Sequence, residues 1–354
     1  MSSELQVMLG DVAVGGGAPV SVQSMTNTRT DDAESTLSQI RALITAGADL
    51  VRVAVPDERA AAAFPWLVEG ASIPLIADVH FDHRLAVAAI EGGAAGVRIN
   101  PGNIGGRREV AAVVDAARTH GAVIRVGVNS GSLQRDLREV ERRDPAAALV
   151  ESAVRQCALL EDLGFTAIKV SAKSSSPMVT VEANRLLAKR VPYPLHIGVT
   201  EAGTRWAGSI RSSVALGVLL AAGVGDTLRV SLAGDPVEEV RVGLEILRTL
   251  EMRKGGPRVI ACPTCGRTRI DVEALAAEVE RRLEESGLDI EVAVMGCAVN
   301  GPGEARKADF GIAGGEGEGV VFAAGRPVRK VPQDSLVDEL FAHIEAANRT
   351  ERDC

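Results

Sequence analysis

Short runs rich in Val, Ile and Leu alternate with longer amphipathic segments between residues 20 and 252. The runs have few polar positions, which is typical of parallel strands with both faces covered. Between them, apolar residues recur at helical spacing, as at Leu37, Ile40, Leu43 and Ile44. Eight strand–helix repeats predict an α/β fold, a TIM (β/α)8 barrel. Its strands are expected at 20–26, 50–56, 75–80, 96–102, 123–129, 167–173, 195–201 and 227–233.

A doubly wound open sheet is the alternative to the barrel. The barrel is favoured because no dinucleotide glycine fingerprint follows the first strand, and because eight units fit the usual length of one barrel. A small hairpin around Gly10-Asp11 is expected before the first strand.

The alternating pattern ends after a helix expected at 237–252. Residues 253–257 combine two basic residues, two glycines and a proline, which marks a helix end and a domain boundary. Beyond them we expect a strand, a helix, a strand, two further strands near 308–326 and a helix at 335–349. The sequence therefore predicts two domains, the barrel at 1–254 and a smaller α+β domain at 255–354.

Composition narrows the classes of function. Hydrophobic residues make up 46% of the 354 positions and aromatic residues 3%, so we expect a core of Ala, Val, Leu and Ile. The formal net charge of −8 argues against a general surface for nucleic acid or acidic membranes. We expect no secretory signal and no membrane span. Five unevenly spaced cysteines do not resemble a disulfide framework, which favours a reducing cytoplasm.

Basic side chains lie between apolar residues in six of the eight predicted strands. Ion pairs with Asp49, Asp78 or Glu201 would explain any one of them. Six cases in strands with few acids favour a shared, multiply charged anion at the C-terminal mouth of the barrel. The planar fork of arginine suits phosphate oxygens, so a diphosphate is expected. The six residues are Arg52, Arg98, Arg125, Lys169, His196 and Arg229.

Polar residues at the ends of the same strands are expected at the same mouth. Small residues at 202–204 and 233–235 suit a phosphate site at helix N-termini. The polar set comprises Ser24, Thr26, Asn27, Asp78, His80, Asn100, Asn129, Ser171, Lys173, Thr200, Glu201 and Ser231.

Two of these residues have a second interpretation. Lys169 could form a Schiff base, as in aldolase-type barrels, although anion binding is favoured. Glu201 is the one carboxylate expected directly at the mouth among the cations, which makes it the candidate proton donor or shuttle. A structural partner for a neighbouring arginine is the alternative for Glu201.

Three of the five cysteines lie on two loops that each follow a predicted strand. Cys262 and Cys265 form a Cys-x-x-Cys pair, and Cys297 lies in a Gly-Pro-rich loop with Glu304. Thiolates at this spacing suit iron–sulfur clusters or zinc. Structural zinc needs a fourth ligand, and three thiolates with one carboxylate would be unusual for it. An iron–sulfur cluster is therefore favoured over zinc. Cys157 is expected to be a packed thiol.

Four long motifs have a family likeness. They lie at 15–28, 198–203, 262–267 and 295–304. Together they resemble the 4-hydroxy-3-methylbut-2-enyl diphosphate synthases, the IspG or GcpE family, in its short bacterial two-domain form. The resemblance extends from residue 7 to residue 348, with no departure at a motif position.

The resemblance implies a function and a set of residues. Members reduce 2-C-methyl-D-erythritol 2,4-cyclodiphosphate with two electrons, opening the ring and releasing water, in non-mevalonate isoprenoid biosynthesis. A [4Fe–4S] cluster would be held by Cys262, Cys265, Cys297 and Glu304. Glu201 would assist the chemistry, and Asn300 would lie close to the substrate. The electron donor would be a flavodoxin or a ferredoxin.

Two other classes of function stay open on the residues alone. One is a non-redox barrel aldolase or transferase with a structural zinc domain. The other is a redox-sensing binding module without turnover, against which the cation-lined mouth argues.

The interdomain link predicts an assembly. A barrel helix that ends at Met252 ends at the N-terminal face, opposite the mouth. Residues 254–257 then reach about 14 Å when extended, which is too short to pass around the barrel. We therefore expect a head-to-tail homodimer, in which one chain's cluster domain caps the other chain's barrel. The family is known for the same arrangement.

Overall fold

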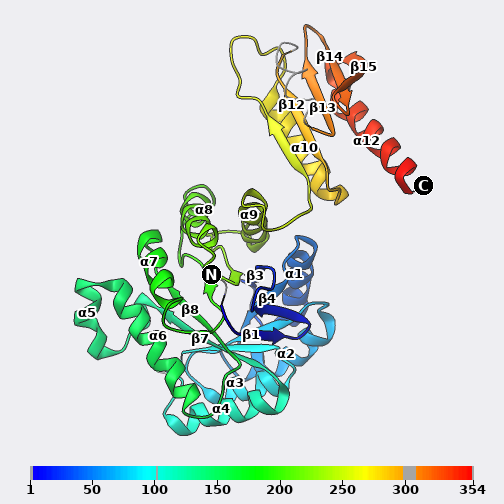
Figure 1. The fold of residues 1–354 in the computed structure, drawn as a ribbon. Helices are drawn as coiled ribbons and strands as arrows, with labels where there is room; N and C mark the ends of the chain where they lie inside the picture. The colour runs from blue at the N-terminus through cyan, green and yellow to red at the C-terminus, as the bar shows by residue number, and fades with distance from the viewer. Residues whose placement is uncertain (1–2, 101–102, 298–307, 353–354) are drawn as a thin grey trace. The chain divides into compact units, whose positions relative to one another are not determined.

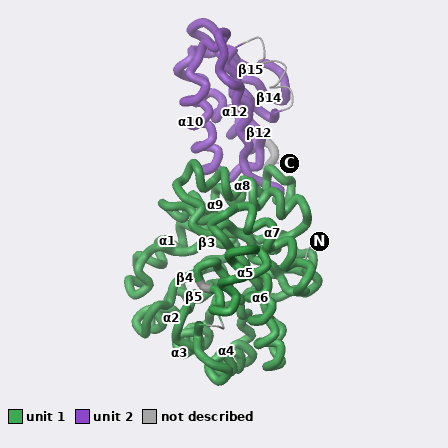
Figure 2. The backbone as a smooth tube through the Cα atoms, turned by 90° about the vertical axis from the view of Figure 1, so that its left-hand side faces the viewer, with its two compact units in different colours: residues 1–253 green, residues 254–354 purple. Residues whose placement is uncertain are grey.

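The chain forms two compact units, residues 1–253 and 254–354 (Figure 2). The computed structural model describes residues 3–100, 103–297 and 308–352 (Figure 1). Each unit has its own sheet and its own hydrophobic core.

The first unit is a closed ring of eight parallel strands, which confirms the predicted TIM barrel. Each strand pairs with its neighbours in chain order, and β3 pairs with β10. A parallel bridge between Val170 and Leu195 closes the ring between the eighth and ninth strands of the chain. The barrel strands are β3 (Ser21–Met25), β4 (Leu50–Ala54), β5 (Leu75–Asp78), β6 (Gly96–Ile99), β7 (Val123–Asn129), β8 (Ile168–Lys173), β9 (His196–Ile197) and β10 (Thr227–Leu228).

The last two strands are shorter than predicted. The segments expected at 195–201 and 227–233 keep ladder pairing for two residues each. Beyond them the chain turns away, and Glu201 has a left-handed backbone with a φ of 52°. Such a conformation does not continue a strand.

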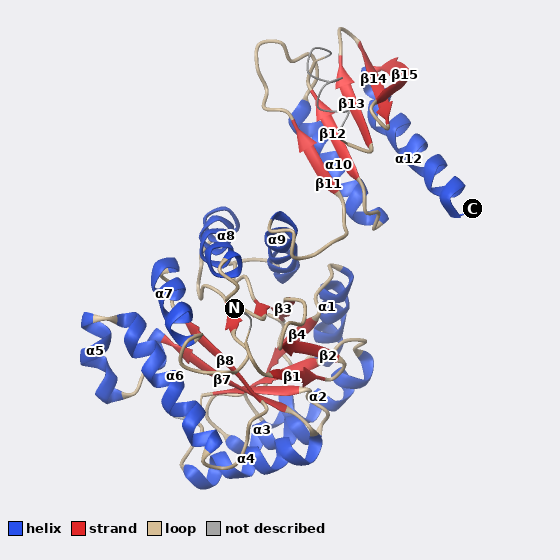
Figure 3. Cartoon of the chain, viewed as in Figure 1, coloured by secondary structure: helices blue, strands red, loops and turns tan. Residues whose placement is uncertain are grey.

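Helices surround the barrel strands (Figure 3). Most of them begin at an Asp or Ser whose side chain accepts a hydrogen bond from a backbone N–H of the first turn, as Asp57 does from Ala60. No helix in the described part of the chain is long and apolar enough to cross a membrane. The helices are α1 (Ala33–Thr45), α2 (Glu58–Gly70), α3 (His83–Glu91), α4 (Arg107–His120), α5 (Arg138–Arg143), α6 (Pro145–Glu161), α7 (Pro177–Leu187), α8 (Arg205–Ala221) and α9 (Pro236–Thr249).

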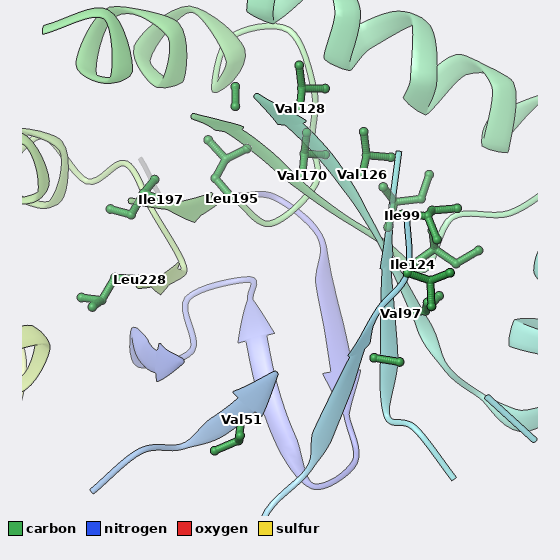
Figure 4. Close-up of a cluster of buried hydrophobic side chains, with 14 of the residues drawn as sticks. Val51, Val97, Ile99, Ile124, Val126, Val128, Val170, Leu195, Ile197 and Leu228 are labelled. Atoms are coloured by element: carbon green, nitrogen blue, oxygen red, sulfur yellow. The ribbon is translucent and has the colours of Figure 1, made fainter. Parts of the chain in front are cut away.

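Alternate residues of each barrel strand face the helices and the interior. In β7, Ile124, Val126 and Val128 belong to the large apolar core between strands and helices. Figure 4 shows part of this cluster, in which Ile124, Val126 and Val128 lie near Val170 of β8. Because side chains alternate along a strand, Arg125 between them faces the barrel interior. The apolar outer layer thus fixes the direction of the polar residues inside.

The hairpin predicted around Gly10-Asp11 is present, and it packs against the N-terminal end of the barrel. It consists of β1 (Gln6–Leu9) and β2 (Val12–Gly15). Its buried residues form a cluster with the first inward-facing residues of three barrel strands. The cluster contains Val7, Leu9, Val14, Leu50, Ile76 and Val123.

The second unit is a five-stranded mixed sheet with two helices on one face. Its strand order is β11 to β15, with β11, β12 and β13 parallel and the others antiparallel. Both helices share one apolar cluster with the sheet. The elements are β11 (Arg258–Ala261), α10 (Val272–Ser286), β12 (Glu291–Met295), β13 (Phe310–Gly314), β14 (Glu318–Ala323), β15 (Arg326–Pro332) and α12 (Leu336–Arg352).

The two strands predicted near 308–326 are β13 and β14, and a third strand, β15, follows them that the sequence did not predict. Ala324 and Gly325 both have positive φ values, of 47° and 72°, and reverse the chain into β15. The strand β15 was hard to recognise because six of its seven residues are exposed, three of them basic and two of them proline, so it has almost no apolar alternation.

Truncating Leu9 should destabilise the barrel, because this residue is 1% exposed in the hairpin cluster. We expect Leu9→Ala to lower the free energy of unfolding by about 2–5 kcal/mol, measured by urea denaturation. Met8→Ala is the matched control, since Met8 is the neighbouring residue and is 47% exposed. Equal effects of the two changes would contradict the closing role of the hairpin.

Candidate functional site

Four charged residues form one row across the barrel interior. Asp78 is paired in register with Arg98, Arg98 with Arg125, and Arg125 with Lys169. They come from the four adjacent strands β5 to β8, and all four are buried. The row exists because each strand has one polar residue between two that face the helices.

Asp78, at one end of this row, is the counter-ion of the neighbouring basic side chains. One of its carboxylate oxygens lies 3.3 Å from Arg98 Nη1, and the other lies 3.6 Å from Arg52 Nε and 3.7 Å from His80 Nε2. Burial alone would raise the pKa of Asp78, but Arg52, His80 and Arg98 outweigh it and hold the pKa well below its usual range. The prediction that Glu201 is the one carboxylate among the cations was therefore wrong.

A second carboxylate, Glu239 of α9, pairs with Arg229. Its oxygens accept hydrogen bonds from Arg229 Nη2 at 3.2 and 3.3 Å and from the backbone N–H of Leu232 at 3.0 Å. Sequence reasoning missed Glu239. The available signal was its position, since this glutamate is 4% exposed on the apolar side of an amphipathic helix.

Met25 of β3 joins the two arginines that these carboxylates hold. Arg52 donates to its sulfur from Nε at 3.2 Å and Nη2 at 3.0 Å, and Arg229 Nη1 lies 3.6 Å from the same atom. Thioether sulfur is a weak acceptor. Burial lowers the pKa of Arg52 to about 10, although the nearby Asp78 carboxylate acts to raise it.

Several nitrogen atoms of buried basic residues have no hydrogen-bond partner among the described residues. These are Nε and Nη2 of Arg125, Nζ of Lys169 and Nε2 of His196. Burial, followed by the neighbouring cations, lowers the pKa of all three residues well below its usual value. His196 is held through Nδ1, 2.8 Å from Thr227 Oγ1. Such groups are costly to bury without an anion, so the site is prepared for one.

Lys173 adds a further cation at the C-terminal end of β8. It is 7% exposed, and burial and Arg125 lower its pKa well below the usual value. The sequence placed Lys173 among the polar residues of the mouth, without an anion-binding role. Lys173 lies four residues beyond Lys169 on the same inward-facing side of β8. It is therefore as well placed as Lys169 to bind an anion.

The remaining residues of the predicted site lie around this interior. Ser171 accepts a hydrogen bond from Arg125 Nη1 at 3.2 Å. Asn100 follows β6 and is buried, and Asn129 ends β7. Thr200 and Ser231 are half-buried beyond the ends of β9 and β10, and Glu201 is exposed there.

Asn27 has a defined role within the chain itself. Its side-chain oxygen accepts from Gln39 Nε2 at 2.7 Å, and its Nδ2 donates to Gly234 O at 3.3 Å. Asn27 thereby ties the end of β3 to the loop after β10. The loop at 202–204 is joined to the same loop, because the Ala233 N–H donates to Gly203 O at 2.9 Å.

The cysteines lie at the C-terminal ends of two paired strands. Cys262 directly follows β11, and Cys297 lies two residues beyond β12, which is parallel to β11. The Gly296 N–H donates to Cys262 Sγ at 3.1 Å. Cys265 is exposed, and its loop is closed by hydrogen bonds with Thr268 of 2.9 and 3.0 Å.

This arrangement fits a metal–sulfur centre in its donor chemistry. A backbone N–H aimed at a cysteine sulfur stabilises a thiolate and tunes a cluster. Within the described residues, no three metal-binding side chains converge as a complete site. The predicted Asn300 and the predicted fourth ligand, Glu304, lie outside the described residues.

The fold and the site define a class of protein, a barrel with a cation-lined interior followed by a cysteine-bearing α+β unit. Residues 4–244 match the GcpE TIM-barrel domain, and residues 258–346 match the GcpE protein C-terminal domain. The chain therefore belongs to the GcpE family. The family that the four motifs predict is confirmed.

Relatives of known name cover almost the whole chain. A protein of Geobacter sulfurreducens is 55% identical over 96% of this chain and 96% of its own length. A protein of Nitratidesulfovibrio vulgaris is 58% identical over 98% of this chain and 91% of its own length. Each is named 4-hydroxy-3-methylbut-2-en-1-yl diphosphate synthase (flavodoxin).

A distant solved structure shares the barrel fold. It is the 3-dehydroquinate dehydratase of Geobacillus kaustophilus, with a TM-score of 0.51 and 18% identity, over 70% of this chain and 99% of that chain. At this identity the likeness concerns the fold alone.

Replacing Lys169 by the apolar Met should stabilise the chain in the absence of an anion. The change removes a buried amine without a partner, so we expect a gain of about 1–3 kcal/mol in the free energy of unfolding at pH 7. Inorganic pyrophosphate should raise the melting temperature of the wild type, and raise that of Lys169→Met less.

The dependence on pH gives a second readout of the same change. Because the fold lowers the pKa of Lys169, the unfolded chain binds more protons, and stability should rise with pH up to the ordinary lysine pKa. This rise should be smaller in Lys169→Met. The exposed Lys189→Met serves as the control and should leave both measurements unchanged. If Lys169→Met were less stable than the wild type, the claim that the buried Lys169 amine destabilises the fold would be wrong.

Proposed function

We propose that the chain reduces 2-C-methyl-D-erythritol 2,4-cyclodiphosphate to 4-hydroxy-3-methylbut-2-enyl diphosphate. The reaction consumes two electrons and two protons, opens the ring and releases one water. The observation that carries the proposal is the set of buried basic residues in the barrel, of which Arg125 and Lys169 have donor atoms without a partner among the described residues. A cyclic diphosphate supplies the charge and the acceptor atoms that these groups lack.

The names of the relatives give the same activity as the sequence motifs. The activity predicted from the sequence is confirmed at this level. A non-redox aldolase or transferase with a structural zinc domain is not favoured. The Schiff-base role for Lys169 loses its support with that alternative.

The diphosphate would be held by the interior cations and the polar strand ends. Arg125 and Lys169 offer unpartnered donors, and Lys173 extends the positive charge toward the mouth. Asp78 and Glu239 fix the directions of the arginines before the substrate arrives, which lowers the cost of ordering them on binding. The proposed substrate-binding residues are Asn27, Arg52, His80, Arg98, Asn100, Arg125, Asn129, Lys169, Lys173, Ser171, His196, Thr200, Arg229, Ser231 and Asn300.

Glu201 is the proposed proton donor to the oxygen that leaves as water. It is exposed at the end of β9, on the same side as the mouth. Its left-handed φ of 52° costs about 1 kcal/mol in a residue with a side chain, and strained backbone of this kind is concentrated at active sites. The strain supports a defined direction for this carboxyl group.

The proposed cofactor is a [4Fe–4S] cluster held by Cys262, Cys265, Cys297 and Glu304. Bound there, the cluster would supply the two electrons of the reaction. The chain's own contribution is to place two cysteines at adjacent strand ends and to aim the Gly296 N–H at Cys262. The proposed electron donor is a flavodoxin, as in the names of the relatives, or a ferredoxin. The proposed compartment is the reducing cytoplasm, because the thiols must stay reduced.

A head-to-tail homodimer is the proposed assembly. Arg253 forms a two-bonded pair with Asp49 at 2.7 and 3.0 Å, and Asp49 also accepts from the Val22 N–H at 2.7 Å. These contacts hold the end of the first unit at the N-terminal ends of β3 and β4. The four residues of 254–257 reach about 14 Å from there. We infer that the cysteine-bearing unit of one chain serves the barrel mouth of a second copy.

Protein prepared without oxygen should contain about four irons and four sulfides per chain and be brown. The cluster needs all three thiolates, so Cys262→Ser should lose most of the iron. Cys157→Ser is the control, because Cys157 is a buried thiol whose pKa is raised by burial to about 12. Iron and sulfide analysis with a visible spectrum provides the measurement. Colourless protein with one zinc per chain would exclude the proposed cofactor.

Glu201→Gln should lower kcat by about 100-fold or more and leave the affinity for the cyclodiphosphate within a few-fold, because it removes the proton and keeps the shape. Steady-state kinetics and direct binding of the substrate separate the two effects. Glu182→Gln is the control, since Glu182 is exposed on α7. Unchanged turnover in Glu201→Gln would remove this residue from the mechanism.

A further inference from the structure

Met25 lies between two arginines of the barrel interior. Its strand, β3, has β4 on one side and β10 on the other. Met25 is paired in register with Arg52 of β4, and Arg229 directly follows the last residue of β10. Adjacent strands are about 4.8 Å apart, so the fold itself brings both arginine side chains to the same methionine.

The sulfur of Met25 accepts hydrogen bonds from both guanidinium groups. Arg52 Nε and Nη2 lie 3.2 and 3.0 Å from Met25 Sδ, and Arg229 Nη1 lies 3.6 Å from the same atom. A thioether sulfur carries no charge and is a weak acceptor. One neutral atom therefore meets the donors of two cations.

Met25 does not have the ordinary role of a methionine inside a protein, which is to fill gaps in an apolar core. Among the described residues, none of the four apolar clusters includes Met25. Val22 of the same strand faces the core between strands and helices, whereas Met25, three residues further on, faces the barrel interior. The surroundings of Met25 therefore make use of its sulfur more than of its bulk.

The two arginines are close enough to repel each other. Burial lowers the pKa of Arg52, and the charge of Arg229 lowers it further, although Asp78 acts to raise it. Asp78 pairs with Arg52 at 3.6 Å, and Glu239 pairs with Arg229 at 3.2 Å. Met25 differs from these carboxylates because its sulfur contacts both arginines at once. An aliphatic side chain at this position would remove an acceptor, and a carboxylate would cancel charge that can bind an anion.

We propose that Met25 is a positioning residue, whose sulfur is an exchangeable acceptor that holds Arg52 and Arg229 in place until a phosphate group replaces it. Hydrogen bonds from arginine to phosphate oxygens are charge-assisted and stronger than those to a thioether, so the phosphate displaces the sulfur readily. The arginines are then already ordered when the anion arrives, which lowers the cost of binding it. This inference rests on the proposed function, because the anion is the diphosphate of the proposed substrate.

Met25→Leu and Met25→Gln test the role of the sulfur in the full-length holoprotein. Leucine keeps the apolar volume and removes the acceptor, and glutamine returns an acceptor at a similar distance along the side chain. We expect Met25→Leu to raise both the Kd of inorganic pyrophosphate, measured by calorimetry, and the KM of the cyclodiphosphate by about 5- to 10-fold, with kcat within about two-fold. Met25→Gln should bring both constants back to within about three-fold of the wild type.

Met178→Leu is the matched control, because Met178 is 66% exposed in the first turn of α7 and should leave both constants unchanged. Wild-type affinity in Met25→Leu would overturn the proposal. A Met25→Gln variant as weak as Met25→Leu would also overturn it, since the shape of methionine would then matter and not its acceptor. A lower kcat in Met25→Leu with an unchanged Kd for pyrophosphate would contradict a positioning role.

A measurement on the wild type does not depend on how the variants fold. With carbon-13 in the methionine methyl groups, pyrophosphate should shift the NMR signal of Met25 and leave that of Met178 in place, because the contacts of the Met25 sulfur are exchanged. An unshifted Met25 signal at saturating pyrophosphate would overturn the proposal. Pyrophosphate binding requires no turnover. A wild type that binds pyrophosphate and does not convert the cyclodiphosphate would therefore refute the proposed function and leave the role of Met25 standing.

Discussion

The excess of positive charge inside the barrel is the constraint on which the rest of the structure depends. Arg52, Arg98, Arg125 and Lys169 all lie in the interior, and Asp78 is the carboxylate in direct contact with the first two. Two features of the fold offset the cost of burying this charge. The aliphatic layer between strands and helices supplies the stability of the fold, and paired carboxylates offset part of the charge. The positive charge that the carboxylates do not offset gives the interior its affinity for an anion.

The basic residues of the site form two groups with different roles. Arg52, Arg98 and Arg229 are held by carboxylates and therefore point in fixed directions. Arg125 and Lys169 have donor atoms that no side chain or backbone group in the described part of the protein accepts from. The first group gives the site its shape, and the second gives it its attraction for phosphate oxygens. A site of the first kind alone would bind weakly, and one of the second kind alone would be disordered.

The alternation of apolar and polar residues was enough to predict the barrel and its inward-facing cations. Arg98 and Arg125 were identified because a single basic residue between two aliphatic ones must face the interior of a covered parallel barrel. An ion pair with Asp78 was only the alternative in the sequence analysis, and that Asp78 contacts Arg52 and Arg98 in particular depends on the register between strands, which no local pattern gives. Glu239 was missed because a glutamate in an amphipathic helix is ordinarily solvated. The strand β15 was missed because six of its seven residues are exposed and two are prolines, so it lacks the apolar alternation of a strand.

The hairpin of β1 and β2 fills the N-terminal end of the barrel with Leu9 and Val14. In the proposed reaction, substrate, proton and electron would therefore all approach the interior cations from the C-terminal mouth. In the proposed assembly, the cyclodiphosphate would have to bind before the cysteine-bearing unit of a second copy covers the mouth, and the product would leave only after that unit withdraws. Each turnover would then include one opening step and one closing step, whose rate would set an upper limit on kcat.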